Sequence, residues 1–102
     1  MRTRNKYFKD YGMDPADVEK VKAWCKQAAP DDKVDIIYRS CRKVCPDLMD
    51  ALMYSIVTGA GYDTLSRSVY IPISRIDFYG YQRKAYEEIF RLAKSLGKIK
   101  FP

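Results

Sequence analysis

The sequence predicts an all-α fold, a single compact domain of about five helices, and three observations support this prediction. Apolar residues recur at spacings of three and four over several segments, the longest of which covers residues 73–96. Capping residues and the helix breakers proline and glycine separate these segments. No segment reads as a convincing strand, and residues 69–73 are the one place where a short extended piece is expected, because Pro72 pushes its predecessor toward extended geometry.

Residues 74–96 form the most strongly predicted helix. Ser74 is a good N-cap, Asp77 can reach back to it, and Gly97 supplies the stop signal. The residues expected on its buried face are Phe78, Tyr81, Ala85, Ile89, Leu92 and Leu96. The residues expected on the opposite face are Ile76, Gly80, Arg83, Glu87, Arg91 and Lys94.

Two helices are expected in the N-terminal half. The first covers residues 14–28, because Asp14 can cap it and Pro15 suits its first position. The residues expected in its buried stripe are Val18, Val21, Cys25 and Ala28. The second helix covers residues 31–45 and ends before Pro46. The residues expected to line its buried face are Val34, Ile37, Cys41 and Val44.

Two shorter helices are expected between these and the last one. A helix over residues 47–58 has apolar residues on two sides, which is typical of a central helix, and it ends at the glycines that follow. Its main buried face is expected to contain Leu48, Ala51, Leu52, Ser55 and Ile56. A further helix over residues 62–68 turns Leu65 inward.

The formal net charge of +6 is unevenly placed along the chain. Residues 1–13 carry +3, residues 14–66 carry −2 and residues 67–102 carry +5. Basic ends of this kind favour a polyanionic partner that both ends contact, and the alternative is a basic protein whose charge serves only solubility.

Residues 1–13 are expected to form a basic N-terminal arm in front of a helical domain at 14–102. In this arm, tyrosine and phenylalanine side chains can pack on the body while the basic side chains stay free to enter a DNA minor groove. Those basic residues are Arg2, Arg4 and Lys6. A frayed terminus is the alternative.

Several classes of function are disfavoured by what the sequence lacks. It has no histidine, the commonest general base and zinc ligand. Cys25, Cys41 and Cys45 are expected to be free, mostly buried thiols, because no second ligand pair completes a metal site. No apolar run reaches the length of a membrane span and no signal peptide is visible. We therefore expect a cytoplasmic, non-enzymatic protein without cofactor, metal or membrane.

Residues 59–90 contain the parts of a helix-turn-helix in order: a glycine break, a packing aliphatic residue, a turn anchor and a capped second helix. The motif Gly61-Tyr62-Asp63-Thr64-Leu65, then Ile73-Ser74-Arg75, then Tyr81 and Arg83-Lys84-Ala85, resembles the helix-turn-helix of sigma-factor region 4. It also resembles small regulators of that type in phages and mobile elements of Gram-positive bacteria. The similarity covers about residues 48–96, although the turn before Ser74 is longer here, with Pro72 among the extra residues.

The resemblance implies a transcription regulator that binds double-stranded DNA through its last helix. Arg75, Ile76, Tyr79 and Arg83 would then face the DNA, together with the neighbouring Gly80 and Lys84. RNA polymerase or another host protein is a further expected partner. A second aromatic stripe on this helix leaves three interpretations open, namely a core wall, a homodimer contact or a seat for the arm; its members are Tyr79, Tyr86 and Phe90.

The sequence leaves two alternatives to DNA binding open. One is a small phage protein that inhibits a host defence nuclease, as anti-CRISPR proteins do, by occupying a nucleic-acid channel. The other is a helical assembly module. Gly80 likewise has two interpretations, a close approach of a phosphate or another backbone, or a tight contact with the third helix, and its outward position argues against the second.

Overall fold

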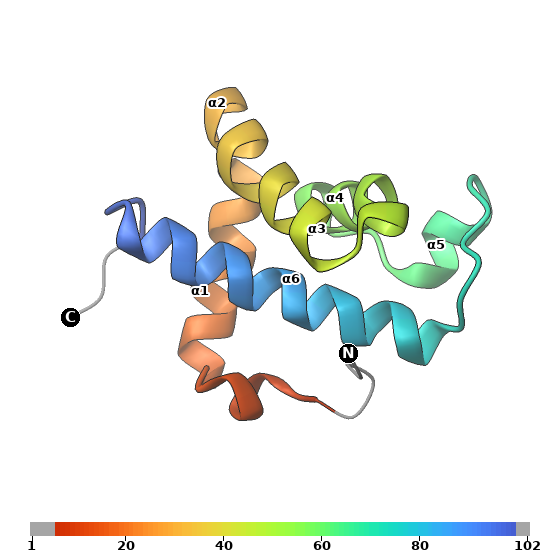
Figure 1. The fold of residues 1–102 in the computed structure, drawn as a ribbon, viewed down its shortest axis with the longest axis horizontal. Helices are drawn as coiled ribbons and strands as arrows, with labels where there is room; N and C mark the ends of the chain where they lie inside the picture. Colours follow the sequence, from red (N-terminus) through yellow and green to blue (C-terminus); the bar gives the residue numbers. More distant parts are fainter. Residues whose placement is uncertain (1–5, 100–102) are drawn as a thin grey trace.

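The longest helix, α6 (Arg75–Ser95), runs across the computed structural model, which describes residues 6–99 of the protein (Figure 1). Ser74 caps this helix as predicted, because its hydroxyl oxygen accepts a hydrogen bond from the Asp77 amide at 3.2 Å. Gly97 follows the helix with a φ of 72°, the left-handed conformation that glycine adopts without strain.

The buried face of α6 agrees with its helical spacing over most of its length. The predicted residues that are fully or partly buried are Phe78, Tyr81, Ala85, Ile89 and Leu92. The prediction for Leu96 is wrong, since its side chain is 56% exposed. The helix ends at Ser95, so Leu96 lies on the turn that reverses the chain and no longer follows the helical stripe.

Helix α1 (Pro15–Gln27) starts with a reciprocal capping box. The Asp17 amide donates to the Asp14 carboxylate at 2.8 Å, and the Asp14 amide donates to the Asp17 carboxylate at 3.2 Å. Val21 and Cys25 are fully buried, as the sequence predicts.

The second predicted helix is a continuous helical run of three segments, α2 (Pro30–Asp32), the π-helical η2 (Lys33–Tyr38) and α3 (Arg39–Val44). Its π turns explain an error in the predicted buried face. A π turn holds more residues than an α turn, because its hydrogen bonds run from i to i+5, so residues within it fall out of α-helical register. Val34 is consequently 61% exposed, and Ile36 takes a core position at 1% exposure.

The middle of the chain folds as η3 (Pro46–Leu48), α4 (Met49–Thr58) and α5 (Tyr62–Ser66). Helix α4 ends at Gly59, which has a φ of 81°. The predicted inner face of this region is confirmed, and its buried members are Leu48, Leu52, Ser55, Ile56 and, on α5, Leu65.

Helix α6 is the central element, because α1, α3, α4 and α5 all pack against it, as does the short 3-10 helix η1 (Phe8–Tyr11). Within residues 6–99 the secondary structure is helical and contains no strand, which confirms the all-α prediction. The radius of gyration of 12.8 Å agrees with a single compact domain, for which about 13 Å is typical at this length. In this described part of the chain, no helix combines the length and apolarity that crossing a membrane requires.

Candidate nucleic-acid interface

Tyr62 fixes α5 to the start of α6. Its backbone N–H donates to the Tyr79 hydroxyl at 2.9 Å, and its own hydroxyl donates to the Ile73 carbonyl at 2.8 Å. The Tyr62 ring also lies 5.6 Å from the ring of Phe78, which is fully buried. These contacts hold residues 61–80, called here the α5–α6 unit, in one fixed geometry.

The position of Tyr79 corrects the expectation that it faces a DNA partner. Its side chain is partly buried, and its hydroxyl is directed at the N-terminus of α5. A Cβ atom added to Gly61 would lie 2.9 Å from this hydroxyl, closer than van der Waals contact allows. Gly61 therefore leaves room for the close approach of the Tyr79 hydroxyl, and both residues belong to the scaffold of the α5–α6 unit.

Arg75 and Ile76 lie exposed at the N-terminal end of α6. The Arg75 guanidinium is 3.5 Å from the Asp63 carboxylate, but the two side chains are 62% and 67% exposed. A pair this exposed contributes little to stability and is readily exchanged for another partner. Ile76 is 56% exposed. These two residues keep the solvent-facing orientation that the sequence predicts.

Farther along α6, two residues predicted to face DNA are not available at a free surface. Gly80 is buried, so the expectation of an outward position is wrong for this residue. The Arg83 side chain donates from Nε to the Lys6 carbonyl at 2.7 Å, and its guanidinium lies 4.9 Å from the centroid of the Tyr7 ring. Arg83 thus contacts the N-terminal segment, whereas the sequence predicts that it faces DNA.

Lys84 also lies within the protein rather than at a free surface. Its side chain is 19% exposed, and its ammonium is 3.1 Å from the Glu87 carboxylate and 3.6 Å from that of Glu88. The same ammonium lies 5.0 Å from the centroid of the Tyr11 ring. These contacts satisfy its charge inside the fold.

The N-terminal segment packs on the body through Phe8, as expected. The Phe8 ring lies 6.3 Å from the Tyr86 ring, and the Lys22 ammonium lies within 5.9 Å of both ring centroids. The N-terminal segment therefore packs on Tyr86. Lys6 is exposed, while Arg2 and Arg4 lie outside the described residues.

Three exposed apolar side chains lie within the α5–α6 unit, and two of them, Val69 and Tyr70, are not among the residues that the sequence predicts at a contact surface. Val69, Tyr70 and Ile76 are 46%, 88% and 56% exposed. Exposed aromatic and aliphatic groups of this kind are enriched in contact surfaces.

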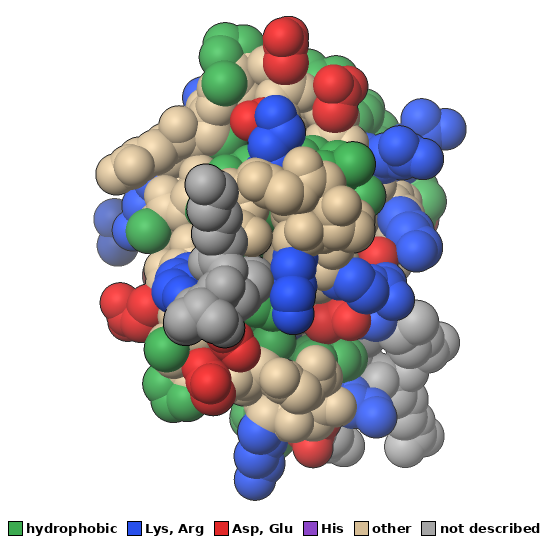
Figure 2. Space-filling model, turned by 90° about the vertical axis from the view of Figure 1, so that its left-hand side faces the viewer, with side chains coloured by type: hydrophobic (Ala, Val, Ile, Leu, Met, Phe, Trp, Pro, Cys, Tyr) green, Lys and Arg blue, Asp and Glu red, His purple; other side chains and the backbone are tan. Residues whose placement is uncertain are grey.

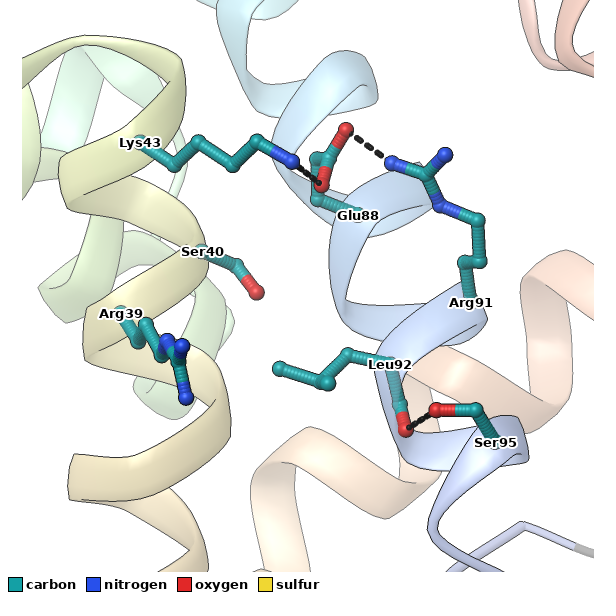
Figure 3. A pocket seen from close by; sticks show the side chains of 7 residues that line it. All are labelled: Arg39, Ser40, Lys43, Glu88, Arg91, Leu92 and Ser95. Atoms are coloured by element: carbon teal, nitrogen blue, oxygen red, sulfur yellow. Dashed lines mark hydrogen bonds and ion pairs between the residues drawn. The ribbon is translucent and has the colours of Figure 1, made fainter.

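A second basic region lies between α3 and α6 and was also missed. Looking toward the C-terminal end of α6, lysine and arginine side chains gather along one edge of the molecule (Figure 2). An open pocket of about 480 Å³ separates the two helices, with basic side chains from both (Figure 3). Its lining residues are Arg39, Ser40, Lys43, Glu88, Arg91, Leu92 and Ser95. Arginine and lysine at positions 39, 42 and 43 share a face of α3, which was the available sequence signal.

Glu88 forms ion pairs with basic side chains of this region. Its carboxylate is buried and accepts hydrogen bonds from Lys43 at 3.1 Å and from Arg91. Burial alone would raise the pKa of Glu88, but the hydrogen bonds and positive charges of Lys43 and Arg91 outweigh it and lower that pKa. Glu88 therefore stays ionised at neutral pH and neutralises part of the basic charge around it.

The three thiols are free, as predicted. Cys25 and Cys41 are fully buried and Cys45 is partly buried. Burial raises the pKa of Cys41 to about 12, and it raises the pKa of Cys25 still further. Among the described residues, no group of three or more cysteine or acidic side chains is arranged to hold a metal ion.

Comparisons with known protein families, with curated proteins and with solved structures found no match to this chain. Its function must therefore be inferred from the geometry of its own residues.

Proposed function

We propose that this protein binds double-stranded DNA through the N-terminal end of α6 and acts as a non-enzymatic, cytoplasmic transcription regulator of the phage or mobile-element type. The observation that carries the proposal is the α5–α6 unit. Its internal hydrogen bonds fix the start of α6, while Arg75 and Ile76 remain exposed at the capped helix terminus. A helix N-terminus with a nearby arginine suits contacts to phosphates and base edges.

The geometry favours docking by the end of α6 rather than along its whole length. Gly80 is buried and Arg83 is engaged with the N-terminal segment, so neither presents a free surface to a groove. The segment between α5 and α6 is long, and it contributes the exposed Arg67 just after α5. In this arrangement the tip of α6 and the preceding loop would enter the major groove, and Lys6 would supply a phosphate contact.

The test compares two arginines in a fluorescence anisotropy titration with random-sequence duplex DNA at several salt concentrations. The wild-type affinity should fall with increasing salt, since phosphate contacts release counterions. Arg75→Ala should weaken binding about tenfold, as expected for the loss of a base or phosphate contact. The matched control is Arg42→Ala, which removes the same charge from an exposed position on α3 and should change the affinity little.

Two results would contradict DNA binding at this site. One is a complete lack of salt-dependent binding by folded protein. The other is an equal loss of affinity in Arg75→Ala and Arg42→Ala, which would indicate a diffuse charge effect rather than a contact at the tip of α6.

A second candidate function, inhibition of a host nucleic-acid-handling protein, is favoured by the exposed apolar side chains of Val69, Tyr70 and Ile76. Aromatic residues at the centre of a contact surface carry much of the binding energy between proteins. This candidate predicts that the protein inhibits cleavage by a purified defence nuclease such as a CRISPR effector, and that Tyr70→Ala removes the inhibition. Size-exclusion chromatography of both proteins would reveal whether these side chains instead join two copies of this chain.

A further inference from the structure

The pocket between α3 and α6 has no part in the proposed DNA contact, yet its side chains are arranged like those of a ligand site. Arg39 and Lys43 approach it from α3, and Arg91 approaches it from α6 (Figure 3). Its volume of about 480 Å³ falls within the range of about 300–1,000 Å³ that is typical of small-molecule sites.

Ser40 provides the observation that points to a ligand. Its residue surface is only 3% exposed, and its hydroxyl is directed into the pocket between the two helices (Figure 3). This hydroxyl makes no hydrogen bond to any other residue within 6–99. The hydroxyl oxygen is open to the pocket, since no fully buried side-chain oxygen or nitrogen in the described chain lacks a hydrogen-bond partner, and it can therefore donate to a polar group bound there.

Arg39 is the second side chain of the pocket that has no hydrogen-bond or ion-pair partner in the described chain. Its guanidinium makes no ion pair or hydrogen bond with another residue of the described chain, whereas Lys43 and Arg91 both contact Glu88. Arginine presents several N–H donors in a planar arrangement that matches phosphate and carboxylate oxygens. Arg39 and Ser40 therefore offer adjacent donors on one wall of the pocket.

The charge of the lining selects the class of ligand. Three basic side chains and the ionised Glu88 give the pocket a net charge of about +2. A phosphate monoester carries a charge of about −1.5 to −2 at neutral pH, which complements the lining better than a single carboxylate does. The aliphatic side chain of Leu92 forms part of the remaining surface and can contact the organic part of such a molecule.

We propose that the pocket between α3 and α6 binds the phosphate monoester of a small molecule, with Arg39 and Ser40 donating hydrogen bonds to the phosphate oxygens. Arg91 and Lys43 face the same phosphate from the rim of the pocket. Glu88 pairs with both of these side chains, competes with the phosphate for them and lowers the net charge of the lining from +3 to about +2.

Isothermal titration of the full-length protein with inorganic phosphate, adenosine and adenosine 5′-monophosphate tests this assignment. Inorganic phosphate should bind saturably, and the monophosphate should bind at least about tenfold more tightly than the nucleoside, since each charged hydrogen bond is worth about that factor. Arg39→Gln should weaken monophosphate binding about tenfold, and Ser40→Ala should weaken it several-fold. Glu88→Gln should strengthen it, because the competing negative charge is removed.

The matched control is Arg67→Gln, which removes one positive charge on the turn after α5 and should leave monophosphate binding unchanged. Circular dichroism and the melting temperature of each variant establish that it is folded. Arg75→Ala should also leave this binding unchanged, so the pocket and the proposed DNA contact can fail independently.

Several results would overturn the proposal. These are the lack of saturable phosphate binding, equal affinity for adenosine and its monophosphate, an equal effect of Arg67→Gln and Arg39→Gln, or weaker binding by Glu88→Gln. The proposal would also be overturned if Arg39→Gln weakened duplex DNA binding but left monophosphate binding unchanged. The pocket would then contact a nucleic-acid backbone instead of a small molecule.

Discussion

The two halves of α6 attach to the rest of the molecule by different chemistry. At the N-terminal half, aromatic groups make the contacts, with Phe78 buried beneath Tyr62 and the Tyr79 hydroxyl bonded to the start of α5. At the C-terminal half, the buried Glu88 accepts from a lysine on α3 and from Arg91 on α6 itself. Both halves bury apolar side chains, but the C-terminal half adds a buried carboxylate whose charge depends on pH.

Three arginines along α6 illustrate the same difference. Arg75, Arg83 and Arg91 follow one another at intervals of eight residues, and each interval rotates the side chain by about 80° around the helix. Arg75 consequently faces solvent, Arg83 meets the N-terminal segment and Arg91 meets Glu88. The type of residue does not determine its role here, because the role depends on which segment crosses the helix at that angle.

The largest expected effect is on the aromatic half. Phe78→Ala removes a fully buried ring that contacts Tyr62 and should lower the free energy of unfolding by about 3–5 kcal/mol. Urea denaturation followed by Trp24 fluorescence measures this loss. The matched control is Phe90→Ala at a partly buried position in the other half of α6, where the loss should be clearly smaller. Equal losses at the two positions would show that the aromatic contacts of Phe78 are not special to the N-terminal half.

Most of the fold could be predicted from the sequence because helix caps and helical spacing are local properties. Asp14, Ser74 and Gly97 mark helix ends in the sequence and mark them in the structure. The two errors in the buried faces arise where the α-helical period stops applying. Val34 lies in a π-helical segment and Leu96 lies just beyond a helix end, and neither change has a clear signature in the residues themselves.

The candidate site was predictable only where its residues depend on α6 alone. Arg75 and Ile76 follow from the cap at Ser74 and lie exposed as expected. The position of Arg83 depends on the path of residues 6–7, and the pocket at Arg39 depends on how α3 crosses α6. Both are tertiary contacts between segments far apart in the chain, which residue spacing within one helix cannot reveal.

The acid response of the two halves should differ. The pKa of Glu88 is lowered in the folded protein, so its contribution to stability is fully present above its ordinary pKa and is lost as the pH falls through the lowered value. Glu88→Gln should lower the free energy of unfolding by about 1 kcal/mol at neutral pH, because its two nearest partners, Lys43 and Arg91, are largely exposed and screened by water.

Urea denaturation at about pH 7 and about pH 3 measures this difference. Wild-type protein should lose more stability between the two conditions than Glu88→Gln. The matched control is Asp63→Asn, which breaks the exposed pair with Arg75 at the other end of α6 and should leave the wild-type acid response nearly intact. An identical acid response in wild type and Glu88→Gln would contradict a stabilising role for the carboxylate.

The smallest expected effect on stability concerns Arg83, which links the middle of α6 to the N-terminal segment. Arg83→Ala removes its hydrogen bond to the Lys6 carbonyl and its contact with the Tyr7 ring, both at exposed positions. The free energy of unfolding should fall by only about 0.5 kcal/mol, as is usual for surface changes. Local opening of the segment should rise, and a lysine-specific protease should cleave after Lys6 and Lys9 several-fold faster under native conditions.

Arg75→Ala is the matched control, because the same substitution eight residues earlier on α6 does not touch the N-terminal segment and should leave the cleavage rate unchanged. If Arg83→Ala also leaves it unchanged, the packing of Phe8 on Tyr86 is sufficient to hold the segment. A measurement of DNA affinity then distinguishes the two roles of Arg83. Faster cleavage without a change in DNA affinity would establish a structural role, whereas weaker DNA binding at an unchanged cleavage rate would restore Arg83 to the DNA-contacting face that the sequence predicts.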